Sequence, residues 1–286
     1  MKHDDHIVKA IEEAKSDPRT DVALFHQALD ADHRGRARNA IRILHLRGTR
    51  AIFNGAVRLC RSKQARVRCV GVDILGQLGT PKMLDRREQA GFLLKMLKQE
   101  KNPDVLYCIG VALGHLGDRR SVPALVGFAN HRNPDVRFGV VFGLLGSEDP
   151  TAIQTLISLS SDKDKEVRSW ATFGLGDMIE KDTSEIRETL FRRVADRSLD
   201  VRNEAILGLA KRKDTRVVEL VLQDLRASNP RVYTLNAAEE FASPIFHPAL
   251  KKHWRQHQGK NHSYWYSKLQ DAMKACAPRS RRHVGG

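Results

Sequence analysis

The stretch "DVRNEAILGLAKRKD", residues 200–214, combines an apolar stripe with a charged end. From Val201 the apolar positions continue at Ala205 and Leu209, a spacing that places them on one face of an α-helix. Similar stretches occur as "DVRFGVVFGLLGSED" at 135–149 and, with more differences, as "ARVRCVGVDILGQLG" at 65–79. The stretch is therefore one copy of a repeat, and the repeat decides the fold.

The repeat extends through most of the chain. Aligned on its Val-Arg pair, it gives equivalent positions at Ala37, Val67, Val105, Val136, Val167, Val201 and Val232, at intervals of 30 to 38 residues. Amphipathic segments precede these copies, as at 121–130 and 151–160, so each unit is predicted to be a hairpin of two helices. Because one hairpin cannot bury its apolar face alone, such units stack. We predict an all-α fold, an α-solenoid of about eight helical hairpins over residues 1–276, and a disordered basic tail at 277–286.

Glycine recurs at one position of the second helix, as Gly143, Gly174 and Gly208. In a helix interior glycine costs about 1 kcal/mol relative to alanine. We expect close packing between neighbouring helices to explain these residues.

An acidic residue often stands six positions before the repeat arginine. The pairs are Asp32 with Arg38, Asp162 with Arg168, and Asp196 with Arg202. This pattern resembles the ladder of aspartate and arginine residues in HEAT repeats. The resemblance implies that the acid of the ladder caps the second helix, while the arginine ties neighbouring units together. It therefore implies a structural role for Arg38, Arg168 and Arg202. Elsewhere the acidic position holds Ser62, Glu100, His131 or Ala227, and there we expect less regular packing.

A more specific resemblance is carried by "RILHLRG" (42–48), "DILGQLG" (73–79), "VRSWATFGL" (167–175) and "DVRNEAILGLAKRKDTRVV" (200–218). Together these stretches are similar to bacterial proteins with lyase-like HEAT repeats that are encoded beside Rhs toxin genes. The resemblance implies an immunity protein, which binds a cognate toxin domain and blocks it.

Positive charge is concentrated toward the two ends of the sequence. Residues 33–72 contain eleven Lys or Arg residues and no Asp or Glu, and residues 250–286 contain nine against the single acid Asp271. The predicted basic patch consists of Arg34, Arg36, Arg42, Arg47, Arg50, Lys251, Lys252 and Arg255. Such a patch attracts phosphates or an acidic protein surface. A solvated surface without a partner is the alternative.

The segment "KKHWRQHQGKNHSYWYSK" (251–268) interleaves basic and aromatic residues. Single-stranded nucleic-acid grooves combine the same residue types. We favour a structural role, because terminal repeats need a cap that closes the last apolar face. The residues predicted to form this cap are Trp254, Tyr264, Trp265 and Tyr266. His253 and His257 have the spacing of a metal-binding pair, but no carboxylate or cysteine stands nearby, so two surface histidines are the favoured interpretation.

Aromatic residues recur two and six residues after the repeat valine. These positions are expected to point away from the core stripe, toward the concave side of the array. In three successive units they are Tyr107 and Val111, Phe138 and Phe142, and Ser169 and Phe173, with Trp170 beside them. Because aromatic side chains are enriched at protein-binding hot spots, the predicted partner-binding site is Tyr107, Phe138, Phe142, Trp170 and Phe173. Burial of several of them in the core is the alternative.

The sequence lacks the motifs of enzymes built from related repeats. It has no His-Glu dipeptide of the deoxyhypusine-hydroxylase type, and no tryptophan is followed after four residues by the aspartate of HEAT-like DNA glycosylases. HExxH, GxSxG and phosphate-binding loops are missing too. The four cysteines form no CxxC pair and are expected to be buried thiols. We therefore expect no catalysis, no cofactor and no bound metal.

No stretch approaches the roughly 18 apolar residues of a membrane helix, and the first residues lack the apolar block of a secretion signal. We expect a cytoplasmic protein. The favoured function is an immunity protein that neutralises an Rhs-type toxin with an acidic surface. The alternative is a nucleic-acid-binding HEAT-repeat protein, similar in fold to the DNA glycosylases but without their catalytic motif.

Overall fold

The computed structural model describes residues 2–30, 34–79, 85–257 and 264–278. Over these ranges the chain forms helices joined by loops and contains no strand, which confirms the predicted all-α fold, an α-solenoid of helical hairpins. The chain divides into two compact units, Met1–Thr155 and Leu156–Gly286. A single array over residues 1–276 stays a prediction, and the predicted tail lies outside the described residues from position 279 onward.

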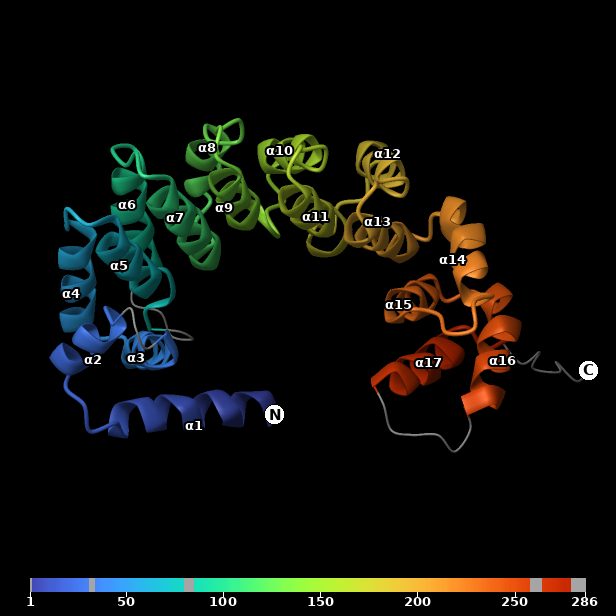
Figure 1. Cartoon of the computed structure of the whole chain (residues 1–286), viewed down its shortest axis with the longest axis horizontal. Coiled ribbons are helices and arrows are strands. Elements are labelled where there is room, and N and C mark those ends of the chain that lie inside the picture. Colours follow the sequence, from blue (N-terminus) through green and yellow to red (C-terminus); the bar gives the residue numbers. More distant parts are fainter. Residues whose placement is uncertain (1, 31–33, 80–84, 258–263, 279–286) are drawn as a thin grey trace, which may run out of the picture. The chain divides into compact units, whose positions relative to one another are not determined.

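In the first unit, α1 (Lys2–Ser16) is followed by pairs of helices, coloured from blue to green in Figure 1. The pairs are α2 (Asp21–Ala28) with α3 (Arg34–Arg47), α4 (Arg50–Cys60) with α5 (Ala65–Gln77), α6 (Arg86–Leu97) with α7 (Pro103–Leu116), and α8 (Ser121–Val126) with α9 (Pro134–Leu144). The next helix, α10 (Pro150–Leu159), contains the boundary between the units. The second helices of the pairs pack side by side, α5 on α7 and α7 on α9.

In the second unit, α11 (Lys165–Phe173) continues into a π-helical turn, η1 (Gly174–Met178). The pairs that follow are α12 (Ser184–Arg193) with α13 (Leu199–Lys211), α14 (Val218–Leu225) with α15 (Val232–Phe241), and α16 (His247–His257) with α17 (Tyr264–Ala275). Short 3-10 turns, η2 (Thr215–Val217) and η3 (Pro244–Phe246), lead into α14 and α16. Here too the second helices pack on one another, α11 on α13, α13 on α15 and α15 on α17.

Polar side chains fix where the second helices begin. Asn102, Asn133 and Asp164 cap α7, α9 and α11 by accepting backbone N–H groups of the first turn. The residue two positions before the cap accepts the N–H of the capping residue itself. Asp162 Oδ1 lies 2.8 Å from the nitrogen of Asp164, and Glu100 Oε1 lies 2.9 Å from that of Asn102. The expectation that the ladder acid caps the helix is therefore wrong, because the acid holds the capping residue instead.

Four of the repeat valines lie in the core of the described hairpins, whereas Val67 is half-buried. Those at most 2% exposed are Val105, Val136, Val167 and Val201. The last repeat differs, because α15 has its N-cap at Arg231 and the third residue after the cap is the buried Thr234. Val232 is only half-buried. The predicted register of this repeat is therefore wrong by two residues, since the connection 226–231 is longer than the corresponding connection 194–198.

Neighbouring second helices approach most closely where glycines face each other. A Cβ atom at Gly110 of α7 would lie 2.5 Å from the carbonyl oxygen of Gly139 in α9. One at Gly143 would lie 2.9 Å from the carbonyl oxygen of Gly110, and one at Gly208 would lie 2.5 Å from the Cα of Gly176. No side chain fits at these distances. Close packing as the reason for the recurring glycines is confirmed at Gly143 and Gly208.

Candidate protein-binding surface

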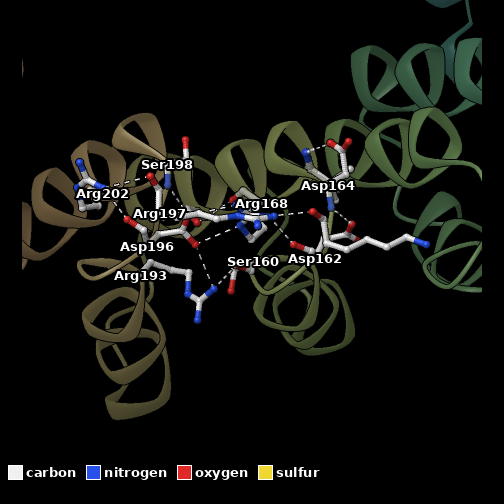
Figure 2. A network of polar contacts seen from close by, with 12 residues as sticks. Ser160, Asp162, Asp164, Arg168, Arg193, Asp196, Arg197, Ser198 and Arg202 are labelled. Carbon is white, nitrogen blue, oxygen red and sulfur yellow. Dashed lines mark hydrogen bonds and ion pairs between the residues drawn. The ribbon is translucent and has the colours of Figure 1, made fainter.

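Arg168 joins two neighbouring repeats of the second unit and is only 4% exposed. Its Nη1 donates to the carbonyl oxygens of Asp162 and Lys163, in the loop before its own helix, at 2.8 and 3.1 Å. Its Nε and Nη2 donate to the carboxylate of Asp196, in the loop before α13, at 3.1 and 3.2 Å. Figure 2 shows these contacts together with Arg193, which lies 3.4 Å from the same carboxylate. All three guanidinium nitrogens bind within the protein, which confirms the structural role predicted for Arg168.

Arg68 makes the equivalent contacts in the first unit. Its Nη1 donates to the carbonyl oxygens of Ser62 and Lys63, both at 3.0 Å. Its Nε and Nη2 donate to Glu100 at 2.7 and 3.0 Å. The prediction that Glu100 departs from the ladder is therefore wrong, because its longer side chain supplies the same carboxylate.

Arg202 makes only half of these contacts. Its Nη1 donates to the carbonyl oxygens of Asp196 and Arg197 at 2.6 and 3.3 Å. Among the described residues, no carboxylate of the following repeat reaches its guanidinium. The predicted structural role of Arg202 is thus confirmed within its own repeat but not toward the next one. Asp32, the acid predicted to pair with Arg38, lies outside the described residues.

Aromatic rings line neighbouring helices of the first unit. The ring of Tyr107 in α7 lies 6.0 Å from that of Phe138 in α9. One turn further along α9, the ring of Phe142 meets that of His115 edge-on at 5.2 Å. Tyr107, Phe138 and Phe142 are all half-buried, so each ring packs on the helices while part of it stays accessible. We call these three side chains the aromatic surface.

The other two predicted aromatic residues lie in the second unit. Trp170 and Phe173 of α11 meet edge-on at 5.6 Å, and both are half-buried. None of the five aromatic residues is fully buried in the core, and their role in partner binding stays a prediction.

A pocket of about 290 Å³ opens beside Tyr107, between α5 and α7. Its lining combines Val70 and Val111 with the polar or titratable side chains of Cys69, Asp73, Tyr107, Cys108 and His115. The spacing that selects Tyr107 also selects Cys69 and Asp73, which stand two and six residues after Val67. These two residues were not predicted as part of the binding site, because the prediction considered only aromatic residues at these positions. The pocket provides space for one inserted side chain next to the aromatic surface.

Two histidines near this pocket have lowered pKa values. His45 is buried, and its Nε2 lies 3.0 Å from the carbonyl oxygen of Asp73. Burial lowers the pKa of His45, although Asp73 acts in the opposite direction. Desolvation lowers the pKa of His115 as well. The lining contains no Lys or Arg and one carboxylate, Asp73, so it disfavours a phosphate and leaves an apolar side chain as the better fit.

The four cysteines are free thiols with different surroundings. Cys60 and Cys276 are buried, and burial raises their pKa values to about 12 and about 11. Cys69 and Cys108 are half-buried at the pocket, where a hydrogen bond between the thiols lowers the pKa of Cys69 and raises that of Cys108. The expectation of buried thiols is thus confirmed for two cysteines and wrong for the other two.

The predicted basic patch contains two arginines that the fold itself uses. The guanidinium of Arg47 donates to the carbonyl oxygens of Ala14, Asp17 and Arg19 and to the carboxylate of Asp21. Arg50 lies 2.7 Å from Glu88 and covers the ring of Phe53. The prediction is wrong for Arg47, because this side chain binds the α1–α2 connection instead of facing solvent. Arg50 is exposed but already paired.

The remaining basic residues are exposed and make no ion pair with any described residue. They are Arg34, Arg36 and Arg42 in the first unit, and Lys251, Lys252 and Arg255 in the second. Each set projects from one helix, α3 or α16, and is available to an acidic partner.

The aromatic residues near the C-terminus bind the last hairpin together. Trp254 of α16 stacks on Tyr266 of α17, with ring centroids 5.0 Å apart and planes at 15°. The indole N–H of Trp265 donates to the carbonyl oxygen of Pro230 at 2.7 Å. These contacts confirm the predicted capping role for Trp254, Trp265 and Tyr266, whereas Tyr264 is 68% exposed.

His253 and His257 do not form a metal-binding pair. His253 is 2% exposed, and its Nε2 lies 2.7 Å from the carbonyl oxygen of Leu225. Nδ1 of His257 lies 2.9 Å from the carbonyl oxygen of His253. The interpretation of His253 as a surface histidine is wrong, because its side chain points from α16 toward the end of α14. Across the described ranges, no group of three or more His, Cys, Asp or Glu residues is placed to hold a metal ion.

Membrane insertion has no candidate segment in the part of the chain that the structure describes, since no helix there combines the length and the apolar composition that a span requires.

Comparisons with known proteins agree with this architecture. The model of HEAT repeats matches residues 91–176 and 153–242, together more than half of the chain. The crystal structure of YibA from Escherichia coli is similar with a TM-score of 0.67 and 24% identity, covering 96% of this chain and 97% of that chain. The CpcE–CpcF complex of phycocyanin lyase from Nostoc gives a TM-score of 0.49 at 15% identity, covering 91% and 96%. No curated protein matches the sequence significantly.

The likeness to YibA shows the fold alone, whereas the match to the repeat model covers Arg168, Arg202 and the five aromatic residues predicted to bind a partner. The chain belongs to the HEAT-repeat family.

Proposed function

We propose that this HEAT-repeat protein binds another protein, and that its partner is a cognate Rhs-type toxin domain, which it neutralises in the cytoplasm. It acts by binding rather than by catalysis and needs no cofactor. The similarity of stretches such as 200–218 to immunity proteins encoded beside Rhs toxin genes supports this choice of partner. The stacked second helices support the mode of action, because they present side chains from successive repeats next to one another.

The observation that carries the proposal is the aromatic surface of the first unit with its adjacent pocket. Tyr107, Phe138 and Phe142 are anchored on α7 and α9 but retain accessible ring area. Such rings bury a large apolar area on docking and lose little conformational freedom. The pocket of about 290 Å³ beside Tyr107 offers space for an apolar side chain of the partner. Accessible aromatic rings next to a pocket are typical of an interface hot spot.

The exposed basic residues have a different part in this proposal. Arg34, Arg36 and Arg42 project from α3 of the first unit without an ion pair to any described residue. Positive charge of this kind accelerates the approach of an acidic partner more than it strengthens the final complex.

The test combines this chain with the toxin domain encoded by the neighbouring gene of the native host. We expect co-expression to restore growth and the purified proteins to form a complex. Replacing Phe142 with Ala should accelerate dissociation at a cost of about 2 kcal/mol, or about thirtyfold in Kd, because the ring belongs to the aromatic surface. Surface plasmon resonance measures both rate constants.

Phe128→Ala provides the matched control. Phe128 is a half-buried ring of the same unit, but it lies in the turn after α8, where it packs on His131 at 6.5 Å, and it does not belong to the aromatic surface of α7 and α9. Its loss should leave dissociation unchanged. Thermal unfolding of both variants separates a binding defect from a hollowed core. If Phe142→Ala dissociates from the toxin domain at the wild-type rate, or loses affinity only because it unfolds, the aromatic surface is not the binding site.

Nucleic-acid binding is the second candidate function. It is favoured by the six side chains of the predicted basic patch on α3 and α16 that are exposed and lack ion pairs with described residues. Phosphate contacts weaken steeply as salt is added, whereas an apolar hot spot persists. Titration of duplex and single-stranded DNA at two salt concentrations tests this candidate.

A further inference from the structure

The arginine ladder of the second unit ends at Arg202. In Arg68 and Arg168, Nη1 binds two carbonyl oxygens of the preceding loop, while Nε and Nη2 bind a carboxylate of the next repeat. Arg202 retains the carbonyl contacts through Nη1. Its Nε and Nη2 donate to no described residue. In Arg68 and Arg168 these two nitrogens bind a carboxylate, so this edge of the Arg202 guanidinium has no partner among the described residues.

The next repeat provides no acid at the ladder position. Asp196 and Glu100 stand two residues before the N-caps of α13 and α7. The residue two positions before the α15 N-cap, Arg231, is Asn229. A neutral amide therefore occupies the position from which the other repeats supply a carboxylate.

A pocket of about 440 Å³ opens beside Arg202, against α13, α14 and α15. Ile206, Leu220 and Val221 give it an apolar wall. Asn203 lies in the same lining, is 8% exposed, and its amide hydrogen bonds to no described residue. The Asn203 amide is not one of the described side-chain groups that are sealed from solvent without a partner, so it is accessible to a ligand in the pocket.

The charges around the pocket leave one cation unbalanced. Arg231 donates to the Asp224 carboxylate at 3.0 and 3.1 Å, and the Thr234 hydroxyl donates to the same carboxylate. This pair is neutral as a whole. Arg202 therefore gives the lining a net charge of about +1, which fits a ligand with a single negative charge.

We infer that this pocket binds a carboxylate carried on an apolar group. The carboxylate takes the place of the missing ladder acid and accepts hydrogen bonds from Nε and Nη2 of Arg202, as Asp196 does from Arg168. The Asn203 amide is available as a further donor, and the apolar part packs on Ile206 and Leu220. A small organic acid and an acidic side chain of a protein share this chemistry. The site lies in the second unit and does not depend on the toxin proposal.

The experiment uses the full chain with 3-phenylpropionate as probe and 3-phenylpropanamide as its uncharged counterpart. Methyl NMR should show shifts of the Ile206, Leu220 and Val221 signals with the acid, and binding of the amide should be at least tenfold weaker. A second arm compares a blocked Leu-Glu-Leu peptide with its Leu-Gln-Leu counterpart. Tighter binding of the glutamate peptide assigns the site to a protein side chain, and tighter binding of the free acid assigns it to a small molecule; either result supports the inference.

Two variants and a control decide whether Arg202 is the anchor. Arg202→Gln should weaken binding of the acid at least tenfold. The control Arg197→Gln removes the same charge from an exposed residue outside the pocket, and its affinity for the acid should stay within twofold of wild type. Because Arg202 also holds its own loop, Asn203→Leu serves as the second variant. It removes the amide donor from the pocket and should weaken binding of the acid at least threefold, and its Tm shows whether the variant is folded. The inference is overturned by unshifted methyl signals, by equal binding of acid and amide, by equal losses in Arg202→Gln and Arg197→Gln, or by unchanged binding in Asn203→Leu.

Discussion

Arg168 is tolerated in a buried position because each of its three guanidinium nitrogens finds an acceptor. Nη1 meets two carbonyl oxygens and the opposite edge meets the Asp196 carboxylate. Five donors in a fixed plane allow arginine to bind both sets at once, which the single ammonium of lysine cannot do. Removing one member of such a pair leaves the others buried and unpaired.

Replacing Arg168 with Gln should lower the free energy of unfolding by about 3 kcal/mol, because the side chains of Arg168 and Asp196 are only 5% and 6% exposed. Urea denaturation measures this change. The control is Arg226→Gln, which breaks an ion pair with Glu219 whose members are 64% and 71% exposed, and should cost less than about 1 kcal/mol. Similar losses in the two variants would contradict a structural ladder.

His45 makes stability depend on pH. Its pKa lies below the ordinary value of 6.5, because burial outweighs the favourable effect of Asp73, and His115 acts in the same direction as burial. As pH falls through about 6.5 the unfolded chain binds a proton that folded His45 does not, so the free energy of unfolding decreases; above that pH the contribution is intact. We expect His45→Gln, which can still donate to the Asp73 carbonyl, to flatten the decrease between pH 7 and pH 5. Urea unfolding across this range measures the slope, and an unchanged slope would exclude His45 as its source.

At the scale of helices, glycines set the distance between α7 and α9. A Cβ atom at Gly110 would lie 2.5 Å from the backbone of Gly139, so two helices rather than one flexible side chain would have to move. Gly91 of α6 has no heavy atom within 4 Å of the same position. The two residues share a helical environment but differ in their neighbours.

Gly110→Ala should therefore destabilise the protein by about 2 kcal/mol through overpacking. Gly91→Ala should stabilise it by about 0.5–1 kcal/mol, because alanine has the higher helix propensity and meets no obstacle. Thermal unfolding compares the two. The packing argument is wrong if both substitutions shift Tm in the same direction.

The helices could be predicted from the sequence alone, but their long-range contacts could not. The apolar spacing from Val167 or Val201 predicts the second helices, because the core stripe is local. The hydrogen bonds of Arg47 are not local, because its carbonyl acceptors lie around the α1–α2 connection, about 30 residues earlier. Helical spacing relates only residues within one helix and therefore does not predict these bonds. The aromatic spacing located Tyr107 and Phe138, but the pocket beside them needs α5 and α7 in contact.

At the scale of the whole molecule, the net charge of +15 makes nonspecific attraction the main competitor of specific binding. Arg47 is part of this charge, but its guanidinium is bound within the fold and is not available to a partner. The six exposed side chains of the predicted basic patch on α3 and α16 make no ion pair with a described residue, so we expect them to steer association. Their effect should appear in the association rate and in its dependence on salt.

The triple variant Arg34→Gln, Arg36→Gln and Arg42→Gln should slow association with the toxin domain about tenfold at low salt and flatten its salt dependence, while dissociation stays unchanged. These three side chains are exposed and make no ion pair with a described residue, so the free energy of unfolding should stay within about 0.5 kcal/mol of wild type. Stopped-flow association at several salt concentrations measures the effect, and Lys251→Gln with Lys252→Gln and Arg255→Gln repeats it for α16.

If the main role is instead to bind nucleic acid, duplex DNA will bind the wild-type chain with a logarithmic salt slope near −0.9 for each neutralised phosphate, and the triple variant will reduce that slope. Unchanged association rates in both triple variants would remove electrostatic steering from the proposed function and leave the aromatic surface as its only support.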